Sequence, residues 1–142
     1  MELQTSTHPT TICPFMRYED APRAIEWLER AFGFQSQLRV PGPDGTIAHA
    51  ELRLGTGVIM LGSLKDDDLG LTSPRALTRV TQGIYVALED VDAHYQQARA
   101  AGAEIVREPA DTEYGSREYL ARDLEGHLWS FGTYRPAEIL TG

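Results

Sequence analysis

Cysteine is nearly absent from this chain of 142 residues, in which Cys13 is the only one. A single cysteine excludes an intrachain disulfide, and no CxxC pair or ladder of Cys and His residues indicates a structural zinc site. Basic residues are also few: 13 Lys and Arg stand against 21 Asp and Glu, for a formal net charge of -8. This acidity argues against a nucleic-acid surface, which needs a basic stripe, and against docking on an anionic membrane.

Long apolar runs are missing as well. No stretch approaches the roughly 20 apolar residues of a membrane span, and residues 1–11 lack the apolar core of a signal peptide. We therefore expect a cytoplasmic protein. No Gly-rich phosphate loop, Ser/His/Asp order or paired-carboxylate motif is present. The remaining composition, 42% apolar and 24% charged, is typical of a globular domain.

What the chain does contain is a repeat. Two Glu-Asp pairs, at 19–20 and 89–90, lie 70 positions apart, and the later glycines Gly33 and Gly102 lie 69 apart. The run GVIMLG at 57–62 is echoed by GHLWSFG at 126–132. Because these landmarks keep nearly one offset through a whole module, we infer an internal duplication.

Each half predicts the element order β-α-β-β-β. In the first, Asp20 is the expected N-cap of a helix, Pro22 fits its first turn, and Gly33 is the expected C-cap. The expected strands are 11–18, 35–40, 47–54 and 58–61, then 83–88, 104–108, 118–122 and 127–134, with the second helix at 92–101. The modules therefore span 8–64 and 83–135, joined by a solvated linker at 65–82, and form one domain over 8–135.

Side-chain alternation along residues 48–54 assigns two faces to one strand. Ala48, Ala50, Leu52 and Leu54 are expected on the helix side, with His49, Glu51 and Arg53 opposite. The predicted fold class is α+β, in which tandem β-α-β-β-β modules form a curved eight-stranded mixed sheet around a cleft.

Several segments resemble the vicinal oxygen chelate superfamily, which includes glyoxalase I, extradiol dioxygenases, fosfomycin resistance enzymes and bleomycin-binding proteins. They are YEDAPRAIEWL at 18–28 with AFGF at 31–34, VALEDVDA at 86–93 and RDLEGHLWSFG at 122–132. The resemblance covers about residues 10–134. It implies the glyoxalase-like fold, whereas for activity the superfamily spans several reactions and some pure binders.

The resemblance also implies four metal-ligand positions, usually His, Glu or Gln. They fall on Cys13, Met60, Gly83 and Ser130, and the pairs Cys13/Gly83 and Met60/Ser130 are each separated by 70. None is a ligand of the family's type, because glycine has no side chain, Met is a soft donor and neutral Ser binds such ions poorly. We expect no metal and no other cofactor.

Other residues keep two interpretations. His49 and Glu51 either grip a ligand, transfer protons or bind a metal, or else form an ion pair on a solvated or dimer-facing sheet surface. Cys13 is either a nucleophile or a small buried hydrophobe. His8, His94 and His127 are expected at surface or turn positions. The predicted cleft residues are Cys13, Phe15, His49, Glu51, Arg53, Met60, Tyr85, Tyr119 and Ser130.

The resulting expectation is a glyoxalase/bleomycin-resistance-like protein that binds a small organic ligand without the family metal, for example to sequester an antibiotic. By resemblance it is expected to be a homodimer. The alternatives are a metal-dependent lyase, isomerase or dioxygenase with relocated ligands, and an interaction module whose cleft is vestigial.

Overall fold

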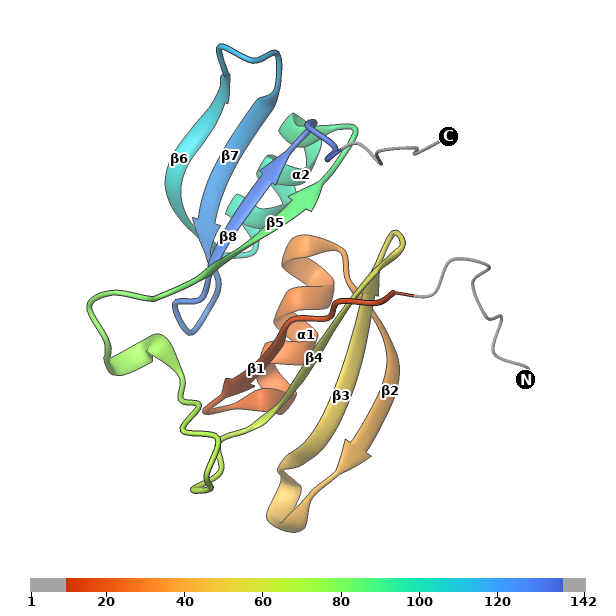
Figure 1. Cartoon of the computed structure of the whole chain (residues 1–142), viewed down its shortest axis with the longest axis vertical. Helices are drawn as coiled ribbons and strands as arrows, with labels where there is room; N and C mark the ends of the chain where they lie inside the picture. The colour runs from red at the N-terminus through yellow and green to blue at the C-terminus, as the bar shows by residue number, and fades with distance from the viewer. Residues whose placement is uncertain (1–9, 137–142) are drawn as a thin grey trace, which may run out of the picture.

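A computed structural model of the chain describes residues 10–136. The first module contains β1 (Phe15–Tyr18), α1 (Ala21–Phe32), β2 (Gln35–Pro41), β3 (Ile47–Leu54) and β4 (Gly57–Ser63). The second contains β5 (Gly83–Ala87), α2 (Val91–Ala100), β6 (Glu104–Asp111), β7 (Arg117–Arg122) and β8 (Leu128–Gly132). Figure 1 shows the two modules one above the other, with the linker running along one side.

The first helix begins and ends where the sequence predicts. The Asp20 side chain accepts a hydrogen bond from the Arg23 N–H, which satisfies one free donor of the first turn. Gly33 ends the helix in the left-handed region at φ 84°, where an L side chain is strained. In α2 the Asp90 side chain caps Ala93 in the same way.

The two sheets have the same topology, β1-β4-β3-β2 and β5-β8-β7-β6. The pairs β1–β4 and β5–β8 are parallel, and the remaining pairs are antiparallel. The α+β class and the duplicated β-α-β-β-β order are therefore confirmed. Within residues 10–136 the eight strands form two four-stranded sheets, so strand pairing in one chain does not produce a single continuous sheet.

One core joins the modules. Each sheet has its helix on one face, and α1 and α2 also pack against each other. Phe32, at the end of α1, contacts the second sheet: its ring centroid lies 4.8 Å from that of Phe131 and 5.4 Å from that of Trp129. All three side chains are fully buried. The end of α1 therefore packs under the second sheet as well as under its own.

The turn between β7 and β8 fixes the second module to the first. The buried Glu125 carboxylate accepts hydrogen bonds from the N–H groups of Glu19 and Asp20 at 2.7 and 2.9 Å, and from the Ser73 hydroxyl at 2.6 Å. Asp123 accepts from the Tyr18 hydroxyl at 2.6 Å. These two acids supply the partners that a buried charge needs, and they connect segments about a hundred residues apart.

His94 is not the surface residue that the sequence suggested. It lies between the modules, where its Nδ1 contacts the Tyr119 hydroxyl and its Nε2 lies 2.8 Å from the Phe32 carbonyl oxygen. Since a carbonyl only accepts, Nε2 carries the proton and Nδ1 accepts from Tyr119. Burial lowers the pKa of His94, against the opposing effect of the Phe32 carbonyl. His127 does lie in a turn, and His8 falls outside the described residues.

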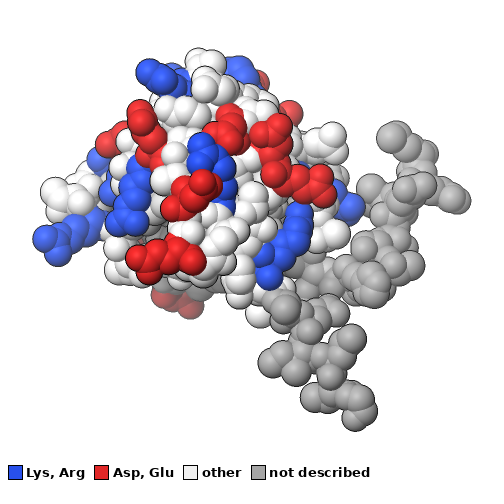
Figure 2. Space-filling model, turned by 90° about the horizontal axis from the view of Figure 1, so that it is seen from above, with Lys and Arg blue, Asp and Glu red and all other residues white. Residues whose placement is uncertain are grey.

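No helix within residues 10–136 is both long enough and apolar enough to cross a membrane. Acidic and basic side chains are both present and intermixed on the face of the molecule shown in Figure 2.

Candidate functional site

The face of the first sheet that points away from α1 holds most of the predicted residues. Strand register places Phe15 beside Met60, and Met60 beside Glu51. His49 and Arg53 share this face because they alternate with the buried Ala50 and Leu52. We call this surface the first open face.

Ala48 of β3, expected on the helix side, lies on the opposite face. Ala48 is exposed and Ile47 is buried instead. The register between β2 and β3 shifts between Val40 and Pro41, and this irregularity inverts the alternation at the start of β3.

A chain of hydrogen bonds crosses the first open face. Arg53 Nε donates to Gln37 Oε1 at 3.0 Å, and Gln37 Nε2 donates to Glu51 Oε1 at 3.1 Å. The other Glu51 oxygen lies 2.9 Å from His49 Nε2. The hydrogen bond from His49, and then that from Gln37, lowers the pKa of Glu51. The carboxylate is thus held ionised by side chains of β2 and β3, and Gln37 is a member that the sequence did not single out.

The corresponding face of the second sheet carries Tyr85 and Ser130, which are register partners. Tyr119 does not join them. It is fully buried on the opposite face, stacked on Phe131 with centroids 5.0 Å apart and with its hydroxyl on His94. Burial raises the pKa of Tyr119 far above its usual value. The expectation that Tyr119 faces a cleft is therefore corrected.

The four positions that the resemblance assigns to a metal do not fit one. Met60 lies on the first open face and Ser130 on the corresponding face of the second sheet. Gly83 begins β5, and Cys13 lies two residues before β1. They offer a thioether, a neutral hydroxyl, no side chain and one thiol, which is not the oxygen and imidazole set that binds a hard divalent ion. Across residues 10–136, no three His, Cys, Asp or Glu side chains gather in a group that could hold a metal ion.

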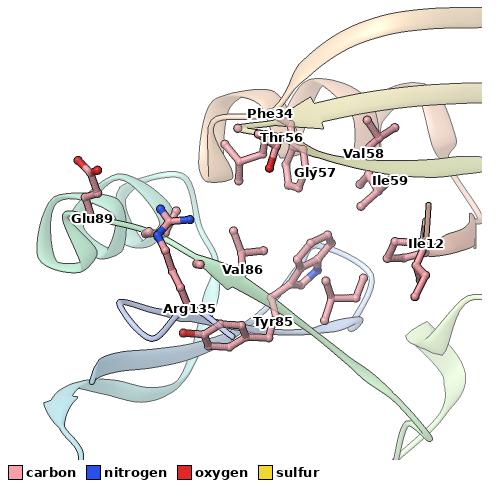
Figure 3. A pocket seen from close by; sticks show the side chains of 17 residues that line it. Ile12, Phe34, Thr56, Gly57, Val58, Ile59, Tyr85, Val86, Glu89 and Arg135 are labelled. Carbon is pink, nitrogen blue, oxygen red and sulfur yellow. The ribbon is translucent and has the colours of Figure 1, made fainter. Parts of the chain in front are cut away.

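A cleft of about 680 Å³ opens between the modules, and the nine predicted residues include only one of its lining residues, Tyr85. Figure 3 shows the two walls: Phe34 and the 56–59 segment face Tyr85 and Val86 across the opening. The apolar side chains that line it are Ile12, Pro14, Phe34, Leu54, Val58, Ile59, Ile84, Val86, Ala87, Leu88 and Trp129.

Polar groups lie mainly at one end of this inter-module cleft. Glu89 and Arg135 lie together at that end, and Ile12 lies at the other (Figure 3). Thr56 lies in the turn between β3 and β4. An apolar body with a few polar groups is the usual composition of a small-ligand site. Alternation along single strands did not reveal this cleft, because the cleft depends on how the packing of α1 against α2 orients the two sheets.

The sequence of this chain has known relatives. Residues 8–131 match the family model described as the Glyoxalase/Bleomycin resistance protein/Dioxygenase superfamily. An uncharacterized protein of Mycobacterium bovis is 35% identical over 126 residues, covering 85% of this chain and 81% of that protein.

Solved structures agree with this match. TioX from Micromonospora sp. ML1 is 39% identical with a TM-score of 0.70, covering 93% of this chain and all of that one (100%). Glyoxalase I from Zea mays, at 19% identity and a TM-score of 0.65, shares the fold over 86% of this chain and 43% of its own. By its sequence match and its duplicated fold, the chain belongs to the glyoxalase/bleomycin resistance protein/dioxygenase superfamily.

Proposed function

We propose that the protein binds a small, largely apolar organic molecule in the inter-module cleft, without the metal used by the enzymes of its superfamily. The observation that carries the proposal is the cleft itself, with about 680 Å³ of space between apolar walls from both modules. This volume lies within the roughly 300–1,000 Å³ of typical ligand pockets. An antibiotic or a similar amphiphilic metabolite fits this description, and binding would sequester it.

Binding rather than catalysis is favoured by the chemistry of the cleft. Among residues 10–136, its titratable lining groups are Tyr85, Glu89 and Arg135, with no Ser, Cys or His nucleophile beside a base. His49 and Glu51, the pair that an enzyme would use, lie outside this cleft. A metal-dependent lyase or dioxygenase remains the rival, and stoichiometric metal in the purified protein would support it.

We further propose that the protein acts as a homodimer in the cytoplasm, in which a second copy covers the first open face. Phe15 is 58% exposed there, and Leu38 and Val40 are more than 40% exposed. These exposed apolar side chains lie at the two edges of the face, on either side of Glu51, and exposed apolar surface favours a protein contact. Sedimentation of Phe15→Ser should show a monomer where the parent chain is a dimer; a parent monomer would contradict this part. Cell fractionation tests the location.

The binding proposal is tested with N-phenyl-1-naphthylamine, a neutral dye whose emission rises in apolar surroundings. Val86→Trp places a large side chain in the cleft, and Val40→Trp makes the same change on the first open face. We expect saturable binding to the parent chain, at least about tenfold weaker binding to Val86→Trp and unchanged binding to Val40→Trp. Equal binding to the two variants, each shown to be folded by circular dichroism, would refute the cleft as the site.

A further inference from the structure

Three exposed tyrosines surround one carboxylate at the end of the second sheet. Tyr114, Tyr134 and Tyr85 have 65%, 50% and 37% of their surface exposed, which is high for aromatic side chains. The carboxylate is that of Glu118, in β7. This tyrosine cluster is separate from the first open face and shares only Tyr85 with the inter-module cleft.

Short contacts hold the cluster together. The Tyr114 hydroxyl donates to Glu118 Oε1 at 2.8 Å, and the Tyr85 hydroxyl donates to the Tyr134 carbonyl oxygen at 2.6 Å. The rings of Tyr114 and Tyr134 meet edge to face, with centroids 6.1 Å apart. The rings are therefore positioned by contacts with their neighbours, even though they are exposed.

Gly132 and Ser116 form the base of the cluster. A Cβ at Gly132 would lie 2.7 Å from both the Tyr85 hydroxyl and Glu118 Cγ, so only glycine lets these two groups lie over the strand here. The buried Ser116 hydroxyl donates to Glu118 Oε2 at 3.0 Å and accepts from the Tyr134 N–H at 3.1 Å. The Glu118 carboxylate is thus oriented by two hydroxyl groups.

No ion pair neutralises the Glu118 carboxylate within the described residues. Burial raises the pKa of Tyr85, and Arg135 opposes this rise, so one guanidinium does lie near the cluster. Within residues 10–136, no Lys, Arg or His nitrogen lies within 4.0 Å of the Glu118 carboxylate, whereas Arg117, next to it in the chain, pairs with Asp92 and Asp111. A carboxylate has about four acceptor sites, and the two hydroxyl donors leave it free to accept more. Tyrosine faces attract cations, and aromatic groups beside an acid are the usual site for alkylated ammonium ions.

We propose that the tyrosine cluster, with Glu118, binds the ammonium group of an organic cation. Tyr85 belongs to both the cluster and the inter-module cleft, so one ligand can place its apolar body in the cleft and its ammonium group among the tyrosines. The ligand class thus inferred, an amphiphilic amine or quaternary ammonium compound, rests on the proposed function. The ammonium site itself does not.

Choline and its neutral isostere 3,3-dimethylbutan-1-ol separate the charge from the shape of the ligand. Binding of each to the full chain is followed by NMR shifts of the tyrosine ring protons. We expect choline to bind about tenfold more tightly, since each exposed ring and the carboxylate contribute a few-fold. Equal affinity for the two probes would overturn the proposal.

Two variants and one matched control localise the effect. Tyr114→Leu and Glu118→Gln should each weaken choline binding about two- to fivefold. Glu113→Gln removes the same charge from an exposed side chain next to Tyr114 and should leave binding unchanged. Tyr114→Phe, which keeps the ring, should bind choline as the parent does; a loss as large as that of Tyr114→Leu would contradict the role of the ring.

The titration with N-phenyl-1-naphthylamine distinguishes a failure of the ammonium site from a failure of the cleft proposal. Dye binding without preference for choline would overturn the ammonium site and leave the cleft proposal standing. Preference for choline without dye binding would support the ammonium site and refute the apolar cleft.

Discussion

The Glu125 carboxylate provides the most quantitative test of how the two modules are joined. Its side chain is completely buried and accepts hydrogen bonds from two backbone N–H groups and one hydroxyl, while Arg75 lies 3.8 Å away. In Glu125→Ala all three donors lose their acceptor inside the protein. A buried donor left without its acceptor costs about 1–3 kcal/mol, so the loss of the acceptor for these three donors should cost about 3–5 kcal/mol.

This loss is large compared with the free energy of unfolding, which is about 5–15 kcal/mol for a domain of ordinary stability. At about 3 °C per kcal/mol for this chain length, the melting temperature should fall by roughly 10–15 °C. Glu125→Gln keeps the shape but replaces one acceptor oxygen with a donor, so it should cost less, about 2–3 kcal/mol.

Urea denaturation followed by circular dichroism measures both changes. Glu113→Ala, which removes an exposed carboxylate of the same module, should change the free energy of unfolding by less than about 0.5 kcal/mol. If Glu125→Ala loses less than about 1 kcal/mol, or no more than the control, the buried carboxylate does not join the modules as described.

Three further outcomes are expected. The pKa of His94 in the folded chain lies below its usual 6.5, so the unfolded chain binds the proton more tightly. The contribution of His94 to the free energy of unfolding should therefore be constant above about pH 7 and fall as the pH drops through 6.5. His94→Gln should flatten this slope in a urea series from about pH 5 to 8, and an unchanged slope would assign it to other groups. Gly33→Ala should cost about 1 kcal/mol because φ is 84°, whereas Gly83→Ala, at an ordinary φ, should be near neutral in the same assay. Mn²⁺, Ni²⁺ or Zn²⁺ should leave the melting temperature unchanged, because Cys13, Met60, Gly83 and Ser130 are poor ligands; a rise of several degrees would revive the metal-dependent alternative.

Local features were predicted well from the sequence because local physics determines them. The caps at Asp20 and Gly33 follow from the first and last turns of one helix, and the repeat gave the element order of both modules. Alternation placed Glu51 and His49 on the correct face, because the polarity of β3 alternates with the buried Ala50 and Leu52.

The misplaced residues lie where this signal is weak or where distant segments meet. Tyr119 and Leu120 are both apolar, so alternation along β7 does not say which of them is buried. His94 sits on a largely polar helix and is half-buried only because Phe32 and Tyr119 come from elsewhere in the chain. The inter-module cleft also depends on contacts across about a hundred residues, such as Tyr18 with Asp123, which no local pattern encodes.

Isoleucine methyl groups give the most direct test of where the ligand binds. Ile12, Ile59 and Ile84 line the inter-module cleft, whereas Ile25, Ile47 and Ile105 lie elsewhere in the described part of the chain. In a methyl-labelled sample titrated with N-phenyl-1-naphthylamine, we expect saturable shifts at the three cleft isoleucines and little change at the other three. Shifts at the Met60 methyl on the first open face, with the cleft isoleucines unmoved, would contradict binding in the cleft.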